Sequence, residues 1–377
     1  MRSLWRWAWV VSAGLGLWAC GSCHNPTEFR VATAGPLSGS ESRTGKDVLN
    51  GVVLAVEETN AAGGVRGRRI VLVSADDGND STKAAEVALA LCRKKPLFVI
   101  GHVDSGCSLK AAPIYQNHKV VMISPTSTSP KLTEQGLDHI FRVCGRDDMQ
   151  GRAAAIWVIK HNMGQRVAVL HESSEYGGGL AREFVTNFEF LSGQKVAFDQ
   201  ELIGDDSKMN EAVQRCKDAG LDLIYFGGLH HQGAAFLRRL RQAGVNAAFM
   251  SGDGCFGPDF VAAAGPENAA GALATFYPDL SSLPGTGTRQ FLAAYKARFG
   301  EPPGPFAIFG YKAAKVGLSA AANAVSPVSH RTLVDALRRL TFQTPYGLLR
   351  FCEKGDPADF RYVMWQVVDG KYEEMGV

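Results

Sequence analysis

Short apolar runs alternate with longer amphipathic segments along almost the whole chain. The runs 98–100 and 120–123 are partly β-branched and bounded by Gly or Pro, which is typical of buried parallel strands. The segment 46–60 instead places apolar residues every three to four positions, as a helix packed on a core does. Repeated alternation of this kind predicts an α/β fold with doubly wound parallel sheets.

The same pattern predicts the individual elements. Strands are expected at 29–34, 69–74, 98–100, 120–123, 139–143, 166–171, 195–200, 221–226, 247–251, 272–276, 347–351 and 362–368. Helices are expected at 46–60, 82–94, 108–118, 148–161, 176–190, 208–218, 232–243, 288–299, 307–324 and 331–340. A second strand–helix series begins at Asp147, and 377 residues are too many for one ordinary domain. Two similar lobes are therefore expected.

Small hydroxyl residues gather after two neighbouring predicted strands. They are Ser105, Ser108, Ser124, Thr126, Ser127, Thr128 and Ser129. Ligands of open α/β sheets bind outside the carboxyl ends of the strands, so both hydroxyl-rich loops should meet at one place. The first loop leads into a helix N-terminus, which favours an anion. The pattern indicates a pocket for a small polar ligand carrying a carboxylate; the alternative is that these residues only cap helices and form turns.

The N-terminus has the pattern of a targeting segment. Arg2 and Arg6 precede the apolar run 7–19, which has the length of a signal-peptide core and is short for a bilayer span. Leu17 lies three positions before Cys20, with a small residue directly before the cysteine, so this stretch resembles a bacterial lipobox. Cys20 is therefore the predicted lipidated first residue of the mature protein. A plain secretory signal with an incidental cysteine is the alternative.

The composition is that of an ordinary soluble protein, with 46% hydrophobic and 20% charged residues. A formal net charge of +3 does not indicate a strongly basic surface, so nucleic acid is not an expected partner. Seven cysteines follow Cys20, and an odd number leaves at least one unpaired. Their spacing does not define which of them pair.

Three catalytic or metal-binding motifs are incomplete in the sequence or missing from it. The stretch 39–47 is one residue too long for a P-loop and has Asp47 where a magnesium-binding Ser or Thr is needed. His230 and His231 lack a nearby second ligand pair in the sequence, so solvated loop histidines and no metal are expected. A Gly-x-Ser-x-Gly motif is absent from the sequence. No cofactor and no enzymatic activity are predicted.

A series of short motifs occurs in a characteristic order from about Phe29 to Asp369. They are 31–39 (VATAGPLSG), 60–67 (NAAGGVRG), 76–77 (DD), 99–102 (VIGH), 123–128 (ISPTST), 141–142 (FR), 176–181 (YGGGLA), 226–228 (FGG) and 249–250 (FM). In this order and spacing the chain resembles the bacterial leucine/isoleucine/valine-binding proteins. These are the extracytoplasmic receptors of branched-chain amino-acid ABC transporters.

The resemblance implies the type I periplasmic binding protein fold, in which two α/β lobes are joined by three hinge crossings and close on a ligand. The crossings are expected near 142–147, 275–279 and 344–351. The implied organisation is a signal peptide at 1–19, a tether at 20–28, an N-terminal lobe from 29–143 plus 278–346, and a C-terminal lobe from 144–277 plus 347–377. Together with the lipobox, the resemblance implies a periplasmic, lipid-anchored and monomeric protein. It is expected to deliver a small amino-acid-like ligand, above all a branched-chain or other aliphatic amino acid, to an ABC permease.

Three first-lobe positions match ligand contacts of the family. Ser105 matches the serine that hydrogen-bonds the ligand carboxylate, and Thr126 matches a position that acts through its backbone. Thr128 matches the threonine that contacts both the ammonium and the carboxylate group. For each hydroxyl, an ordinary capping or loop role is the alternative.

Two second-lobe positions complete the implied contacts. Tyr176 matches an aromatic residue that lines the closed cleft, with interlobe packing as the alternative. Asp253 stands where the family has an acidic residue for the ligand ammonium, with a turn role before Gly254 as the alternative. A cation buried by lobe closure must be paired, so a carboxylate fits this position.

Two positions depart from the family pattern in the region expected to surround the ligand side chain. Thr44 replaces an aromatic residue, and Leu229 replaces a tyrosine. Both are expected to line the pocket, which becomes larger and plainer. Such a pocket suits an aliphatic side chain of a different shape, or a ligand that is not an amino acid.

Two other functions remain open at this stage. The first is a sensory or regulatory receptor of the same fold, which binds an amide or a small carboxylate and is read by a separate membrane partner. The second is an exported enzyme on a similar fold.

Overall fold

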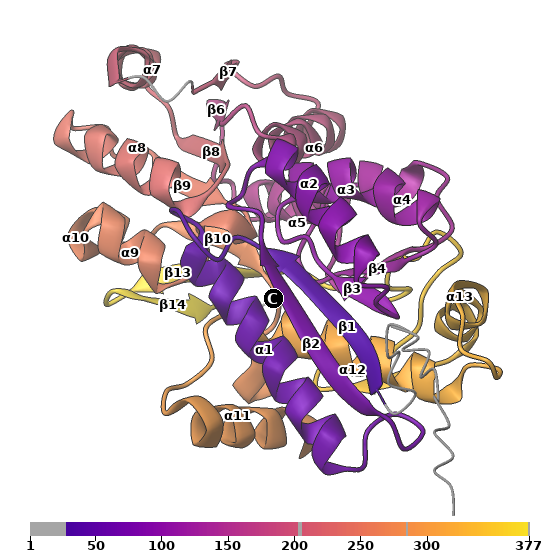
Figure 1. Cartoon of the computed structure of the whole chain (residues 1–377). Helices are drawn as coiled ribbons and strands as arrows, with labels where there is room; N and C mark the ends of the chain where they lie inside the picture. Colours follow the sequence, from indigo (N-terminus) through magenta and orange to yellow (C-terminus); the bar gives the residue numbers. More distant parts are fainter. Residues whose placement is uncertain (1–27, 203–205, 284–285, 376–377) are drawn as a thin grey trace, which may run out of the picture.

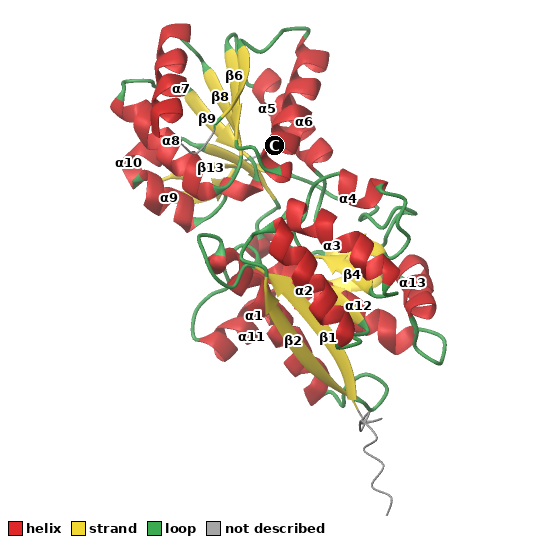
Figure 2. Ribbon diagram, turned by 45° about the horizontal axis from the view of Figure 1, so that its top comes forward, coloured by secondary structure: helices red, strands yellow, loops and turns green. Residues whose placement is uncertain are grey.

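The computed structural model describes residues 28–202, 206–283 and 286–375, which form two α/β lobes (Figures 1 and 2). The first lobe is built on five parallel strands in the order β2-β1-β3-β4-β5. The strands are β1 (Glu28–Gly35), β2 (Arg69–Asp76), β3 (Phe98–Ile100), β4 (Val121–Ser124) and β5 (Ile140–Arg142). The predicted signal peptide, the tether and Cys20 lie outside the described residues, except for residue 28.

The second lobe is built on seven strands in the order β14-β13-β10-β9-β8-β6-β7. Five of them are mutually parallel: β6 (Val167–His171), β7 (Phe198–Glu201), β8 (Leu223–Gly227), β9 (Ala248–Ser251) and β10 (Leu273–Phe276). The strands β13 (Val363–Val368) and β14 (Lys371–Glu374) add an antiparallel edge. The predicted two-lobed α/β fold is therefore confirmed.

Helices cover both sheets. Those between the strands are α1 (Ser42–Ala61), α2 (Ser81–Arg93), α3 (Ser105–Asn117), α4 (Lys131–Glu134), α5 (Asp147–Lys160), α6 (Glu175–Ser192), α7 (Asp206–Ala219), α8 (His230–Gln242), α9 (Pro258–Ala264) and α10 (Pro266–Ala269). After β10 the chain returns to the first lobe as α11 (Thr286–Phe299), α12 (Ala307–Asn323) and α13 (His330–Arg339). No helix of the described residues is both long and apolar enough to cross a bilayer.

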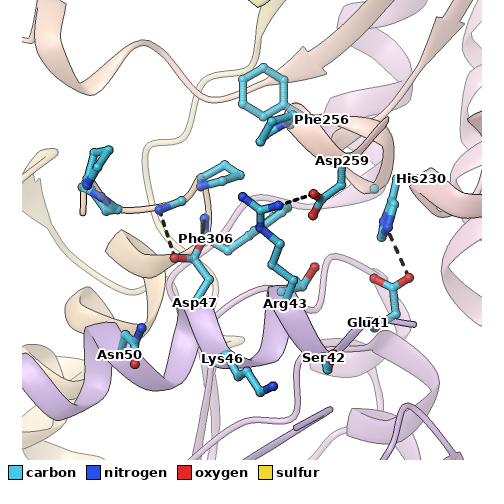
Figure 3. A pocket seen from close by; sticks show the side chains of 18 of the residues that line it. Glu41, Ser42, Arg43, Lys46, Asp47, Asn50, His230, Phe256, Asp259 and Phe306 are labelled. Atoms are coloured by element: carbon cyan, nitrogen blue, oxygen red, sulfur yellow. Dashed lines mark hydrogen bonds and ion pairs between the residues drawn. The ribbon is translucent and has the colours of Figure 1, made fainter. Parts of the chain in front are cut away.

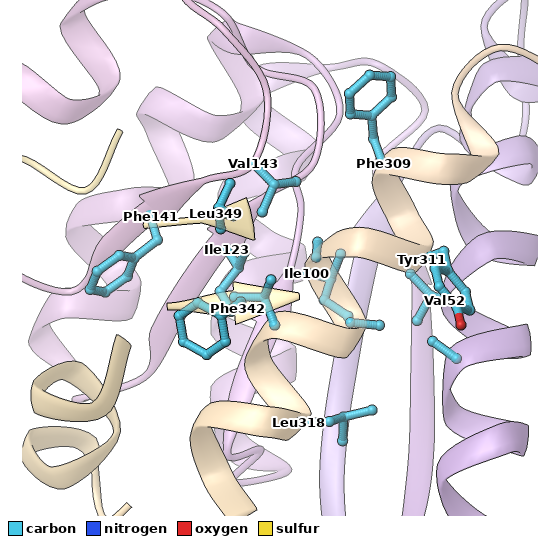
Figure 4. Close-up of a cluster of buried hydrophobic side chains, with 14 of the residues drawn as sticks. Val52, Ile100, Ile123, Phe141, Val143, Phe309, Tyr311, Leu318, Phe342 and Leu349 are labelled. Atoms are coloured by element: carbon cyan, nitrogen blue, oxygen red, sulfur yellow. The ribbon is translucent and has the colours of Figure 1, made fainter. Parts of the chain in front are cut away.

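A short hairpin precedes the last passage into the second lobe. Its strands β11 (Phe342–Thr344) and β12 (Gly347–Leu349) pair with each other and belong to neither large sheet. Phe342 and Leu349 are buried with α12 and the first-lobe strands (Figure 4). The predicted boundary at 346/347 falls inside this hairpin, and the exact lobe limits stay a prediction.

Most predicted elements are present, and the differences lie in short segments. The helix predicted at 108–118 begins at Ser105, because Asp104 caps it by accepting a hydrogen bond from the backbone N–H of Cys107. The helix predicted at 232–243 begins at His230, so the expectation that His230 and His231 are loop residues is wrong. The helices α4, α9 and α10 and the strands β11 and β14 were not predicted. All five have seven residues or fewer, too few for a clear periodicity.

A buried ion pair connects the first crossing to the loop after β12. Arg142 is fully buried, and its Nε lies 2.6 Å from Oδ1 of Asp356. Its Nη1 donates to the carbonyl of Ser127, and its Nη2 donates to Thr133 Oγ1. Arg146 reaches the second oxygen of Asp356 at 3.1 Å. One guanidinium thus ties the hydroxyl-rich loop after β4 to two segments near the lobe junction.

Helices α1 and α12 pack with their backbones in close approach. A Cβ atom on Gly51 would lie 1.9 Å from the carbonyl oxygen of Ala307, and one on Gly310 would lie 2.0 Å from that of Val48. Both distances are far below any van der Waals contact, so each helix needs a glycine at this crossing. The crossing fixes α1, whose first turn faces the cleft.

We expect Gly51→Ala to destabilise the protein by about 1–3 kcal/mol, because the methyl group overpacks this backbone contact. Chemical denaturation and the thermal midpoint measure the change. Gly178→Ala is the matched control: it is also helical, and its new Cβ would meet its nearest neighbour at 3.5 Å. The control should be neutral or stabilising by up to about 1 kcal/mol. Equal stability of wild type and Gly51→Ala would show that the helices can move apart at no cost.

Candidate functional site

A small pocket lies between the lobes where the carboxyl ends of strands from both sheets face each other. Its volume is about 50 Å³, and we call it the inner pocket. It is lined by Glu41, Thr44, Asn79, Val103, Asp104, Ser105, Thr126, Tyr176, Leu229, Asp253, Gly254 and Phe306. Six of the seven predicted ligand residues are in this lining. Thr128, the seventh, is not, although it is buried on the loop that contributes Thr126.

The first-lobe side of the pocket is held by side-chain contacts to backbone. Ser105 is buried in the first turn of α3, and its Oγ accepts a hydrogen bond from the backbone N–H of Ser129 at 3.2 Å. Because Asp104 is the helix cap, the capping alternative for Ser105 is not what the structure shows. Thr126 donates its hydroxyl to the carbonyl of Val103 at 2.9 Å, which leaves its backbone for other contacts.

Other hydroxyls of the two loops serve the scaffold. Ser127 Oγ lies 2.6 Å from Ser108 Oγ and within hydrogen-bond distance of the carbonyls of His102, Val103 and Asp104. These contacts fasten the loop after β4 to the loop after β3. Ser108 and Ser127 therefore have the structural role of joining the two loops. Ser105, Thr126 and Thr128 stay the candidates for contact with a ligand.

The second-lobe side of the pocket carries a buried carboxylate. Asp253 is 5% exposed and opens a short 3-10 turn after β9. Tyr176 donates its hydroxyl to Asp253 Oδ1 at 2.7 Å and accepts the backbone N–H of Gly254 at 2.8 Å. Burial raises the pKa of Asp253 to about 6, against the opposing hydrogen bond from Tyr176. The pocket therefore contains a desolvated carboxylate that a cation would stabilise.

The sequence did not reveal a second buried acid, Asp147, at the start of α5. Neither of its carboxylate oxygens has a hydrogen-bond partner within the described part of the chain, and the same holds for Thr128 Oγ1 and Gln150 Oε1. Burial, followed by the neighbouring charge of Asp253, raises the pKa of Asp147 well above its ordinary value. The sequence position of Asp147 does not distinguish a site residue from an ordinary one. Acidic residues are common in the first turn of a helix, because they interact favourably with the helix dipole.

The inner pocket adjoins a second, larger space of about 610 Å³, which we call the outer cavity (Figure 3). The two share Glu41, Thr44, Leu229, Gly254 and Phe306 in their linings. The two positions that depart from the family pattern thus lie on the wall between the two spaces. The outer cavity is also lined by charged side chains, including Arg43, Lys46, Asp47 and Asp259.

Polar contacts join the lobes around these two spaces. Arg43 on α1 pairs with Asp259 on α9, and Lys131 on α4 pairs with Glu175 on α6. Glu41, directly before α1, lies 3.2 Å from Nδ1 of His231. The partly exposed pairs contribute little stability individually, about 0–1 kcal/mol. They define the edge of the cleft.

The cysteines offer no second site. Six are described, five of them buried, and none of these six forms a disulfide. Burial raises the pKa of the Cys107 thiol, so it remains protonated and unreactive.

Two facing α/β lobes with a small pocket between them are the arrangement of solute-binding proteins. A family model described as periplasmic binding protein matches residues 28–371. A leucine-, isoleucine-, valine-, threonine- and alanine-binding protein of Pseudomonas aeruginosa is 34% identical over 338 residues, 90% of this chain and 89% of the relative. The chain belongs to the periplasmic binding protein family and, within it, to the group similar to leucine/isoleucine/valine-binding proteins.

Solved structures agree with this assignment. A leucine-binding protein from Thermotoga maritima is similar with a TM-score of 0.85 and 29% identity, over 92% of this chain and 98% of that chain. A branched-chain amino acid transporter substrate-binding protein from Streptococcus pneumoniae, in complex with isoleucine, has a TM-score of 0.84 and 25% identity with the same coverage. The family is one of solute-binding proteins, and its name implies a periplasmic location.

The buried Asp253 predicts that ligand affinity depends on pH. Below about pH 6 the carboxyl is neutral and attracts an ammonium group less, so affinity for an ammonium-bearing ligand should fall up to tenfold per pH unit. The folding stability of the ligand-free protein should change with pH in the opposite direction. Because folding raises the pKa of Asp253, this carboxyl contributes stability that is fully present below its pKa in the unfolded chain. That stability is lost as the pH rises through about 6.

Calorimetric titration between about pH 5 and pH 8 measures the binding effect. Asp253→Asn should bind weakly at every pH and give a flat profile. An Asp253→Asn profile that still declines toward acid would assign the titration to another group.

A second prediction concerns Asp147. Asp147→Asn should weaken binding of an ammonium-bearing ligand at least tenfold, because it removes a buried acceptor beside Asp253. The matched control is Asp148→Asn, which changes the next residue, whose carboxylate pairs with Arg146. Unchanged affinity in Asp147→Asn would show that this acid has a purely structural role.

Proposed function

We propose that this protein is an extracytoplasmic receptor that captures a small amino acid between its lobes and delivers it to an ABC permease. The observation that carries the proposal is the pairing of opposite chemistries in one pocket. Asp253 offers a buried carboxylate on one side, and Ser105 offers a hydroxyl in the first turn of α3 on the other. An α-amino acid carries the two complementary groups at a short separation.

Each end of such a ligand has a physical partner. Its carboxylate accepts hydrogen bonds from the Ser105 hydroxyl and from backbone N–H groups of the loop after β4, with the dipole of α3 adding a favourable field. Its ammonium group pairs with the carboxylate of Asp253, which without such a partner is a buried charge with a high desolvation cost. Thr128 and Asp147 are buried outside the pocket lining, and we propose them as further acceptors for that group in the ligand-bound form. Closure removes water from these contacts, so binding and closure support each other.

The ligand side chain is proposed to pass Thr44 and Leu229 toward the outer cavity. The relatives named above bind leucine, isoleucine, valine, threonine or alanine, and an aliphatic amino acid is the ligand class we propose here. The small Thr44 and aliphatic Leu229 leave more room than aromatic residues would. This favours side chains at least as long as that of leucine.

The proposed cellular arrangement follows from the N-terminal motif. Lipidation of Cys20 would hold a monomeric receptor at a bacterial membrane, and the residues before β1 would form the tether. The closed form would then be presented to the permease.

A thermal-shift screen of the soluble form lacking Cys20 tests the proposal. The screen covers amino acids, amides and small carboxylates. A ligand at 100 times its Kd should add about 2.7 kcal/mol of stability. We expect aliphatic amino acids to give the largest shifts, with Asp253→Asn and Ser105→Ala abolishing them. Asp218→Asn, an exposed change on α7, is the control for charge alone. A shift with simple carboxylates and none with amino acids would overturn the proposed ammonium contact.

Restoring aromatic residues should change which ligands bind. In Leu229→Tyr and Thr44→Tyr the wall between the inner pocket and the outer cavity closes. We expect about tenfold weaker binding of the longest side chains and retained or improved binding of valine and alanine. Calorimetry on both variants measures the ratio. An unchanged ratio would show that the ligand side chain does not approach this wall.

A further inference from the structure

Three potential metal ligands from opposite lobes meet at the edge of the cleft. Glu41 directly precedes α1 of the first lobe, and His230 and His231 are the first residues of α8 in the second lobe. Figure 3 shows Glu41 and His230 pointing toward each other across the gap. The carboxylate and the histidines are about 190 positions apart in the sequence, so no short sequence motif contains all three residues.

The spacing of the three groups is that of ligands around one ion. Oε1 of Glu41 lies 3.2 Å from Nδ1 of His231 and 3.6 Å from Nδ1 of His230. One ligand atom from each residue lies within 4.8 Å of the others. In a tetrahedral zinc site, bonds of 2.0–2.2 Å place neighbouring ligand atoms about 3.3 Å apart. The two separations that involve Glu41 are close to this value, and the two imidazole nitrogens lie within 4.8 Å of each other.

The charge balance at Glu41 also calls for a cation. The carboxylate side chain is 5% exposed, and its ion-pair partners among the described residues are these two histidines, with no Lys or Arg. A buried carboxylate is costly unless it is paired. Glu172 lines the same surface hollow as His231 and adds a second carboxylate to this region.

We propose that Glu41, His230 and His231 form a binding site for a divalent transition-metal ion of the zinc type that bridges the two lobes. Imidazole nitrogens with one carboxylate oxygen suit Zn²⁺, Cu²⁺, Ni²⁺ and Co²⁺ better than Mg²⁺ or Ca²⁺. Glu41 and His230 line the outer cavity, so water can take the fourth position.

A bridging ion couples metal binding to lobe closure. The three ligands come together when the lobes approach, so the ion favours the closed form. By linkage, a solute that favours closure must then tighten metal binding by the same factor that the metal tightens solute binding. The site requires no assumption about the identity of the solute.

The test uses the tag-free mature protein, stripped of metal by chelator and dialysis, with Co²⁺ and Zn²⁺ themselves as probes. Four-coordinate Co²⁺ should give a visible d–d absorption band that Zn²⁺ displaces. His230→Gln, His231→Gln and Glu41→Gln should each weaken Zn²⁺ binding at least tenfold. Small-angle scattering should show that Zn²⁺ compacts the wild type and none of these variants.

His171→Gln is the matched control, because His171 lies 3.5 Å from one carboxylate, that of Asp199, within a single lobe. It should bind Zn²⁺ like the wild type. Circular dichroism and the metal-free thermal midpoint verify that every variant is folded. Absence of the Co²⁺ band, or equal Zn²⁺ affinity in wild type and all three ligand variants, would overturn the site and leave a histidine–carboxylate ion pair only.

Discussion

The burial of Arg142 is the constraint on which the arrangement of the site depends. A guanidinium removed from water must have its charge and its donors compensated. Here Asp356 pairs with the charge, and Ser127 and Thr133 accept hydrogen bonds from the two Nη atoms. Removing one partner of such a pair typically costs about 3–5 kcal/mol, because the other charge is left unpaired. The same contacts fix the carbonyl of Ser127, and with it the loop that carries Thr126 and Thr128. The ion pair thus links the position of the pocket to the segments through which the lobes are joined.

The two lobes bring different chemistry to the cleft. The first lobe supplies hydroxyls, backbone amides and a helix N-terminus, which suit an anion. The second lobe supplies Asp253, with Asp147 beside it, which suit a cation. Neither face is electrostatically satisfied by itself, because two neighbouring buried acids repel each other and resist ionisation. A ligand with both charges would resolve this conflict, so the proposed selection of a zwitterion would follow from the pairing of the two lobes.

Much of the fold was predictable from the sequence, because strands such as β3 and β4 are continuous apolar runs between Gly or Pro residues. Ser105 and Asp253 were predicted as ligand contacts from the family resemblance, and the structure places both in the lining of the inner pocket. Asp147 was missed, because an acidic residue at a helix start has an ordinary dipole role, and burial does not show in the sequence. His230 and His231 were not predicted as metal ligands for another reason. The carboxylate near them, Glu41, is brought there by tertiary structure alone. Of the hairpin, only the second strand, β12, was predicted. Strands of three residues are too short to show the alternation of apolar and polar positions.

The glycine crossing of α1 and α12 has a mechanical consequence. At Gly51 and Gly310 the backbones of α1 and α12 meet with no side chain between them, so the two helices cannot slide past each other at this crossing without a clash. α12 in turn is tied to the lobe junction, where Lys312 donates to the carbonyl of Val143 at 2.9 Å. The start of α1, with Glu41, Arg43 and Thr44, therefore moves as part of a stiff lever. Its contacts across the cleft should engage and release together, so the gap between the lobes has few stable intermediate widths.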